Sequence, residues 1–287
     1  MSLTTSESQL MEDVDGINSA AGIGWTRYVE SVGPQGAQGT VRIAALLRIV
    51  AAKNAKGMKL NEIGAMAGLE QSTAHRIVSA LHSVDFLSRD PQTRRYHLGP
   101  LLYELFTTAF PHFNMRDICF PAMANLASRM GDTVYLSVRS GFDGICVERQ
   151  EGSYPIRTCT LDVGQRRLLG VGAGNLALLS ALKDMEINTI MEHNAERYEA
   201  YGLSPELLRA RIERVREQGY VHQNAVSSTE VKAIALPIRG RTGHPFGALS
   251  MTAINARMTE QRAMEVVAAL REEIEGLEQR IGELGYV

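Results

Sequence analysis

The chain has 287 residues, of which 45% are hydrophobic and 22% are charged. These proportions are those of globular proteins and exclude a wholly disordered or fibrous chain. The longest uncharged stretch, 168–182, is shorter than the ~20 apolar residues that span a bilayer. The N-terminus lacks the pattern of a secretory signal, and the three scattered cysteines favour reduced thiols. We therefore expect a cytoplasmic protein of about two domains, without a membrane partner.

Charge is unevenly distributed along the chain. Residues 37–100 contain nine basic and four acidic residues, whereas 1–36 and 101–287 both carry an acidic excess. A compact basic module beside an acidic remainder favours a polyanion-binding domain, although solvated helices often carry a similar surplus. Residues 1–36 are rich in Ser, Gly and acidic side chains, and they are predicted to form a flexible N-terminal extension.

Three helical segments follow one another in the basic module. Apolar periodicity predicts helices over 40–52, 60–67 and 69–85, and a glycine ends the second of them. Two short helices that meet at a glycine-containing turn are typical of a helix-turn-helix, whose second helix directs its first residues at the major groove of DNA. The candidate base-contacting residues are Gln71, Ser72, Thr73, His75 and Arg76.

The polar start of this third helix has two interpretations. Ser72 and Thr73 are common at helix starts in any protein, because they satisfy free backbone N–H groups. Five polar residues in six are nevertheless unusual for the first turns of a core helix, and none of the five is acidic. We therefore favour DNA binding.

A basic hairpin is predicted directly after this helix. Strands at 86–87 and 96–98 flank a turn at Asp90-Pro91. Arg94 and Arg95 at this wing are candidates for contacts with phosphates or a minor groove. A charged turn is also common on protein surfaces, but the order of three helices and a basic hairpin is not. The DNA-binding domain is thus predicted to cover 37–100.

The remaining chain contains strands, then helices, then strands again. An apolar helix over 101–110 is predicted to join the domains, within a linker at 101–114. The patterns predict further helices over 117–130, 174–182 and 205–218 and strands over 133–139, 145–149, 156–161, 220–226, 231–238 and 246–254. This order indicates an α+β domain over 115–287 with a mostly antiparallel sheet.

The last predicted helix, 259–284, has an apolar seam whose steps alternate between four and three residues. A seam of this period packs either on the domain's own sheet or against a partner helix. We expect packing on the sheet.

Residues 40–99 closely resemble the N-terminal domain of IclR-family transcriptional regulators. The resemblance rests on STAHR at the start of the third helix and on RYHLG at the end of the hairpin. It continues through GVGAGNLALL, RVREQGYVHQ, VKAIALPI and GALSMTA, in the family's order, and covers roughly 40–280. It implies an α+β two-domain protein: a winged helix-turn-helix joined by a helix to a GAF-like effector-binding domain. The implied function is a ligand-responsive regulator that binds operator DNA as a homodimer or homotetramer.

The resemblance also implies where a small organic effector binds. Gly172 and Ala173 match the glycine loop whose backbone meets the ligand. Ser250 and Thr252 match hydroxyl positions in the pocket and alternate along one strand face.

Two further pocket positions depart from the pattern of relatives that bind small oxo-acids. Gln223 and Ala233 stand where those relatives have an acid and a cysteine, which argues against glyoxylate or pyruvate. An aromatic or other organic acid is the expected effector. Arg157, Arg166 and Lys232 are candidates for a carboxylate anchor, although each is expected to be a surface charge.

No catalytic residue, cofactor or metal site is predicted. The glycine loop at 170–174 lacks the preceding strand and the glycine spacing of a dinucleotide-binding turn. The seven histidines are scattered without metal-ligand spacing, and no nucleophile-elbow motif is present. The alternative function is a small-molecule sensor or an enzyme of the same GAF-like fold with non-specific DNA affinity.

Overall fold

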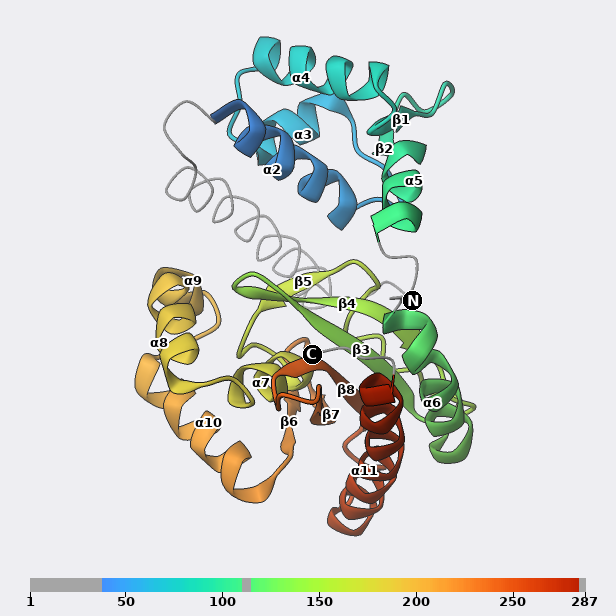
Figure 1. Cartoon of the computed structure of the whole chain (residues 1–287), viewed down its shortest axis with the longest axis vertical. Coiled ribbons are helices and arrows are strands. Elements are labelled where there is room, and N and C mark those ends of the chain that lie inside the picture. Colours follow the sequence, from blue (N-terminus) through green and yellow to red (C-terminus); the bar gives the residue numbers. More distant parts are fainter. Residues whose placement is uncertain (1–37, 110–114, 284–287) are drawn as a thin grey trace, which may run out of the picture. The chain divides into compact units, whose positions relative to one another are not determined.

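The computed structural model describes residues 38–109 and 115–283. Contacts divide the chain into two units, Met1–Phe113 and Asn114–Val287, and Figure 1 labels the elements of both. The predicted extension over 1–36 lies outside the described residues, as do the ends of two predicted helices, Phe110 and Leu284. Among the described helices, none is both long enough and apolar enough to cross a membrane.

The first unit is a winged helix-turn-helix. Its elements are α2 (Gln38–Ala52), α3 (Leu60–Met66), α4 (Gln71–Ser83), β1 (Leu87–Arg89), β2 (Tyr96–Leu98) and α5 (Pro100–Ala109). The apolar stripes predicted on the helices meet in one core, where Leu46, Ile63, Val78 and Leu87 are fully buried. β1 and β2 form an antiparallel pair, and the turn between them projects from this unit (Figure 1).

The end of α4 differs from the prediction. Val84 belongs to the predicted apolar stripe, but it is 52% exposed and lies one residue beyond the helix. Asp85 has a φ of 60°, so the chain turns sharply there, and the backbone N–H of Phe86 donates to Leu81 O at 3.0 Å. This turn directs the chain into β1, which is why the helix stops before its apolar pattern does.

The second unit is built on a six-stranded sheet with the order β5-β4-β3-β8-β7-β6, and every neighbouring pair is antiparallel. The α+β prediction is therefore confirmed. The strands are β3 (Thr133–Ser140), β4 (Asp143–Gln150), β5 (Arg166–Leu168), β6 (Val221–Ala225), β7 (Ser228–Arg239) and β8 (Pro245–Ile254).

Helices lie on both sides of this sheet (Figure 1). They are α6 (Met115–Met130), α7 (Ala173–Ser180), α8 (Asp184–His193), α9 (Ala195–Glu199), α10 (Pro205–Gln218) and α11 (Glu260–Glu283). Helix α7 is buried along its whole length and contacts β7, β8 and β3, while α11 contacts β7 and α6. The apolar seam of α11 from Ala263 to Ile281 is buried, so this helix packs within its own domain, as predicted.

The prediction of a strand over 156–161 is wrong. Its alternating side chains suggested a strand, but the exposed edge of β4 is already paired with β5. Residues 151–165 instead form an irregular connection between β4 and β5, which we call the strap. The strap is held mainly by side chains from other elements rather than by a strand ladder. The short helices α8 and α9 were not predicted.

Candidate DNA-binding face and effector pocket

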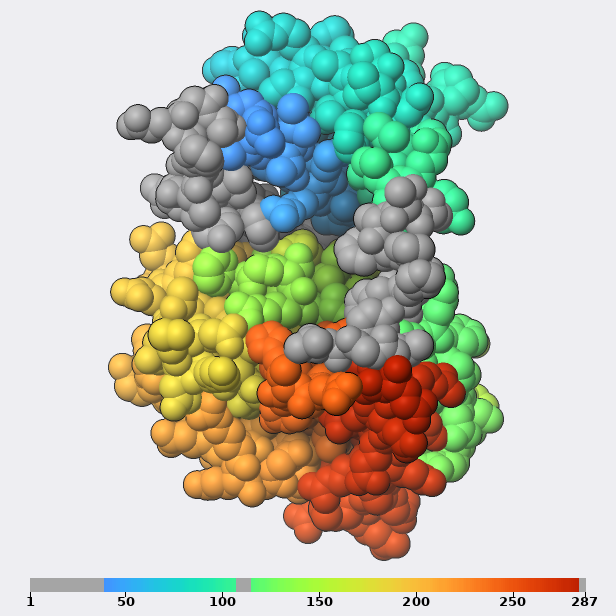
Figure 2. All heavy atoms as spheres, viewed as in Figure 1, coloured from blue at the N-terminus to red at the C-terminus, as the bar shows by residue number. Residues whose placement is uncertain are grey.

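The start of α4 presents its polar residues at the surface. Gln71, Ser72, His75 and Arg76 are exposed and Thr73 is half-buried, whereas Ala74 in the same turns is buried. Figure 2 shows α4, in cyan, at the surface of the first unit. All five side chains predicted to contact bases therefore lie outside the core, on the helix that a helix-turn-helix inserts into the major groove.

Close packing in the turn fixes the position of α4. Gly68 has a φ of 63°, a conformation that favours glycine, and it follows the C-cap of α3. A Cβ atom built on Gly64 would lie 3.1 Å from Ala74 Cβ, so α3 and α4 approach each other closely. At the other end of α3, the Glu62 side chain accepts a hydrogen bond from the Lys59 backbone at 2.9 Å and caps the helix.

Asp90 organises the tip of the wing. Its carboxylate accepts hydrogen bonds at 2.8 Å from the backbone N–H groups of Gln92 and Thr93. These bonds hold the pKa of Asp90 below its ordinary value. Arg94 follows with a φ of 58° and an exposed side chain. The turn thus presents Arg94 to solvent from a defined backbone.

The second wing arginine is directed at the protein itself. The Arg95 guanidinium donates to Gly57 O at 2.9 Å and lies 3.4 Å from the Glu62 carboxylate. Its side chain is 32% exposed. Arg94 and Arg95 were predicted as equivalent DNA contacts, but the structure gives them different surroundings: Arg95 connects the wing to the residues before and within α3, and Arg94 does not.

Two adjoining cavities lie at the start of α7: the larger extends between α10 and β6, and the smaller lies over strands β3, β8 and β7. The larger has a volume of about 500 Å³, within the usual range for small-molecule sites, and the smaller of about 40 Å³. They share the wall formed by Val171, Gly172, Ala225 and Val226. The two cavities therefore adjoin each other along these residues.

All six residues proposed for the effector site line these cavities. The smaller is lined by Gly172, Ala173, Ala233, Ser250 and Thr252, and the larger by Gln223 and again Gly172. Strand register explains much of this grouping, because Gln223 pairs with Ala233 and Ala233 pairs with Thr252. Paired residues of neighbouring strands point to the same face of a sheet.

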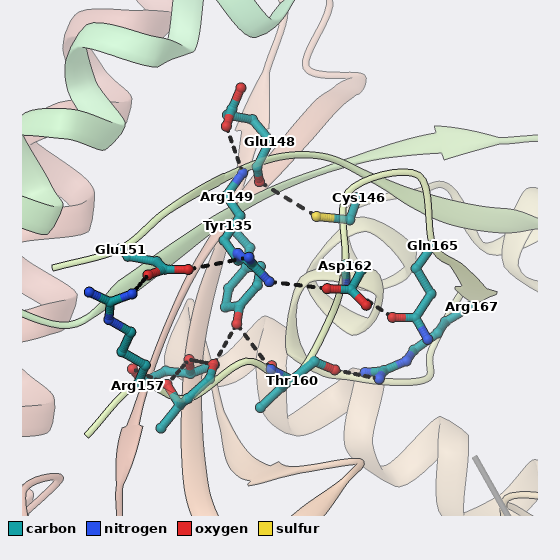
Figure 3. A network of polar contacts seen from close by, with 12 residues as sticks. Tyr135, Cys146, Glu148, Arg149, Glu151, Arg157, Thr160, Asp162, Gln165 and Arg167 are labelled. Atoms are coloured by element: carbon teal, nitrogen blue, oxygen red, sulfur yellow. Dashed lines mark hydrogen bonds and ion pairs between the residues drawn. The ribbon is translucent and has the colours of Figure 1, made fainter. Parts of the chain in front are cut away.

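The strap borders the smaller cavity through Thr160 and Leu161, and Figure 3 shows the polar contacts that hold it. The Tyr135 hydroxyl donates to Thr158 O and accepts from Thr160 N–H at 3.1 Å. Thr158 and Thr252 share a hydrogen bond of 2.6 Å between their hydroxyls, so the Thr252 hydroxyl already has a partner. Burial raises the pKa of Tyr135, which keeps its hydroxyl protonated as a donor.

Ion pairs hold the outer part of the strap. Arg149 on β4 lies 3.2 Å from Glu151 and 3.1 Å from Asp162, and Arg157 lies 2.7 Å from Glu151 (Figure 3). The Arg157 side chain is 65% exposed. Arg157 therefore stabilises the outside of the strap and does not line either cavity.

The other two candidate carboxylate anchors also lie away from the cavities. Arg166 donates to Ser140 and lies 3.5 Å from Asp143, while Lys232 is half-buried on β7. The arginine that lines the smaller cavity is Arg167, the neighbour of Arg166, and it was not predicted from the sequence. Ser137, on β3, was missed as well. Strand β5 was not predicted, so the alternation that places Arg166 and Arg167 on opposite faces could not be recognised in the sequence.

Comparison with known families identifies both units. The family model of the bacterial transcriptional regulator IclR C-terminal domain matches residues 107–277, and that of the IclR helix-turn-helix domain matches residues 39–91. The chain belongs to the IclR family of transcriptional regulators. The regulator thus combines a helix-turn-helix DNA-binding domain with the C-terminal effector-binding domain of this family.

Curated and solved relatives agree with this assignment. The regulator is 28% identical to the HTH-type transcriptional regulator KipR of Bacillus subtilis over 84% of this chain and 96% of that protein. An IclR transcriptional regulator from Alicyclobacillus acidocaldarius has the same fold, with a TM-score of 0.71, 22% identity and coverage of 85% and 98% of the two chains. An IclR homologue from Microbacterium hydrocarbonoxydans, solved with 4-hydroxybenzoate, matches with a TM-score of 0.62, 24% identity and coverage of 82% and 98%.

Proposed function

We propose that this regulator reads operator DNA with the first turns of α4 and responds to an organic acid bound in the two cavities. The main support for this proposal is that one chain has both features. The start of its recognition helix is polar and exposed, and a cavity large enough for a small ligand is lined in part by polar groups. Gln71, Ser72, Thr73, His75 and Arg76 contact bases in this proposal, and Arg94 contacts the phosphate backbone. The regulator acts in the cytoplasm.

The effector class rests on two considerations. A relative of the same fold was solved with 4-hydroxybenzoate, an aromatic acid. In this chain, the larger cavity combines apolar residues such as Leu176, Leu203 and Val215 with polar ones such as Gln223. An aromatic or aliphatic body with an acidic group fits such a lining.

The regulator acts as a symmetric homodimer or homotetramer in this proposal, because one recognition helix reads only a few base pairs. The effector changes DNA affinity by binding unequally to the DNA-competent and DNA-incompetent arrangements of the protein. The change in operator affinity is no larger than this difference in effector affinity.

The proposal is tested by selecting binding sites from a random DNA library and measuring affinity across a salt series. A specific regulator binds the selected sites about 10³-fold or more tightly than random DNA. If no sequence is enriched, the chain is not a sequence-specific regulator, and the alternative of a sensor with non-specific DNA affinity is supported.

Base reading by Arg76 has its own test. We expect Arg76→Ala to weaken binding to the selected site by about 10-fold or more while changing binding to random DNA much less. Arg280→Ala, at an exposed position on α11, is the control and should change neither affinity. An equal loss on both DNAs would show that Arg76 contacts only the backbone.

A further inference from the structure

Arg167 brings a half-buried positive charge to the smaller cavity. The residue lies on β5 and lines this cavity, and burial lowers the pKa of its guanidinium. Its recorded hydrogen bond goes to Thr160 O at 2.6 Å, and it makes no ion pair within residues 38–109 and 115–283. A guanidinium has five N–H donors, so one carbonyl partner leaves most of them available.

Two buried hydroxyls face the same space. Ser137 is 3% exposed and Ser250 is 6% exposed, and neither side chain has a hydrogen-bond partner in the described part of the chain. By contrast, the Tyr135 and Thr252 hydroxyls at this cavity are engaged with the strap. Both hydroxyls are therefore available to a ligand in this cavity.

The first turn of α7 brings these groups together. A Cβ atom built on Gly174 would lie 3.0 Å from Ser137 Oγ and 3.6 Å from Ser250 Oγ, and one built on Gly172 would lie 3.7 Å from Arg167 Nη1. No side chain caps this helix, so the backbone N–H groups of its first turn add donors and a partial positive charge. The guanidinium, the hydroxyls and the helix start therefore converge on one small space.

The chemistry of this space selects an anion of limited size. Among the described lining residues of the smaller cavity none is acidic, and Arg167, Ser137 and Ser250 can each donate a hydrogen bond to a ligand. Its volume of about 40 Å³ exceeds the roughly 10–15 Å³ that one water molecule requires and suits a single small group. A carboxylate matches the planar fork of a guanidinium with its two oxygens. The larger cavity adjoins this space at Val171, Gly172, Ala225 and Val226, and the rest of the molecule would extend toward it.

We propose that Arg167 selects the effector by charge, binding its carboxylate together with Ser137, Ser250 and the start of α7. This inference rests on the proposed function of the second unit and specifies which residue recognises the acid. Arg167 keeps its bond to Thr160 O and uses its remaining N–H groups for the ligand.

The test compares acids with their uncharged analogues by calorimetry on the full chain. The probes are acetate, butyrate, benzoate and 4-hydroxybenzoate, each beside its amide. We expect at least one acid to bind, and to bind at least 10-fold more tightly than its amide. If none of the four acids binds, or if amides bind equally well, the proposal is overturned.

The variant Arg167→Gln removes the charge and retains a donor for Thr160 O. We expect it to weaken acid binding by about 10- to 100-fold and to leave amide binding nearly unchanged, with Arg167→Lys intermediate. Arg157→Gln is the matched control, because this exposed strap arginine lies outside the cavity, and it should retain wild-type affinity. Equal acid affinities in Arg167→Gln and the wild-type protein would overturn the proposal.

Ser137→Ala provides a second variant that removes only one oxygen. This variant should bind acids several-fold more weakly than the wild-type protein. If its acid affinity is unchanged, Ser137 does not bind the carboxylate. Binding of ligand-free Arg167→Gln to the selected DNA sites separates the two hypotheses. Normal DNA binding with lost acid selectivity supports both hypotheses. If the wild-type protein binds acids selectively but recognises no operator, the carboxylate-site proposal is supported and the proposed function as a DNA-binding regulator is contradicted.

Discussion

Adjacent residues of the same type have different roles at two places in this protein. Arg166 and Arg167 lie on opposite faces of β5: the first contacts Ser140 and Asp143, and the second lines the smaller cavity. Arg94 and Arg95 differ in a similar way at the wing. In each pair the role is decided by the direction in which the backbone points the side chain, which residue type alone does not reveal.

The wing arginines give a prediction at this scale. Arg94→Ala should weaken binding to all DNA sequences and reduce the salt dependence of binding by about one phosphate contact, because it removes an exposed charge. Arg95→Ala should instead lower the free energy of unfolding by about 1 kcal/mol, since its bond to Gly57 O holds the wing. Salt-dependent DNA titration and urea unfolding measure the two effects. A loss of stability in Arg94→Ala together with a loss of DNA affinity alone in Arg95→Ala would contradict these roles.

At the scale of helices and strands, local pattern predicted most of the fold. The helices of the first unit, the wing and five strands of the large sheet follow from periodicity and turn residues. The strand over 156–161 failed because pairing depends on which sheet edge is free, and β5 already occupies the edge of β4. Helix α9 has only five residues, which is too short for a periodic pattern, whereas the ten-residue α8 was missed although its buried residues Ile187, Ile190 and Met191 have helical spacing.

The candidate site was only partly accessible to sequence reasoning. The resemblance to a family supplied Gly172 and Ser250, and both line the smaller cavity. Arg167 and Ser137 were missed because their role depends on the face of a strand and on the position of the strap, and both depend on the folded sheet. The strap itself carries no motif that predicts its path.

Helix α11 gives a prediction for an element. Leu270 is fully buried in its seam, so Leu270→Ala should lower the free energy of unfolding by about 2–5 kcal/mol. Met264, on the same helix, is 55% exposed, and Met264→Ala should change stability by less than about 0.5 kcal/mol. Urea unfolding followed by far-UV circular dichroism compares the two. Equal losses would contradict packing of this seam on β7 and α6.

At the scale of the whole molecule, symmetry leads to a prediction about the operator. If two recognition helices act together, selected sites should contain inverted half-sites about 10 base pairs apart, or a multiple of that spacing. Inserting five base pairs between the half-sites turns them to opposite sides of the DNA and should abolish tight binding, whereas inserting ten should restore part of it. Binding that ignores the spacing would contradict a rigid symmetric dimer.

The way in which the strap is held has a consequence for how this protein can change over evolutionary time. Arg167 and Tyr135 bind the main-chain oxygens of Thr160 and Thr158, which every amino acid possesses. Substitutions at Thr160 and Leu161, which line the smaller cavity, can therefore alter its shape without displacing the segment that carries them. Descendants of this protein can acquire new effectors by single mutations here while the sheet, the helices and the DNA-reading surface remain the same.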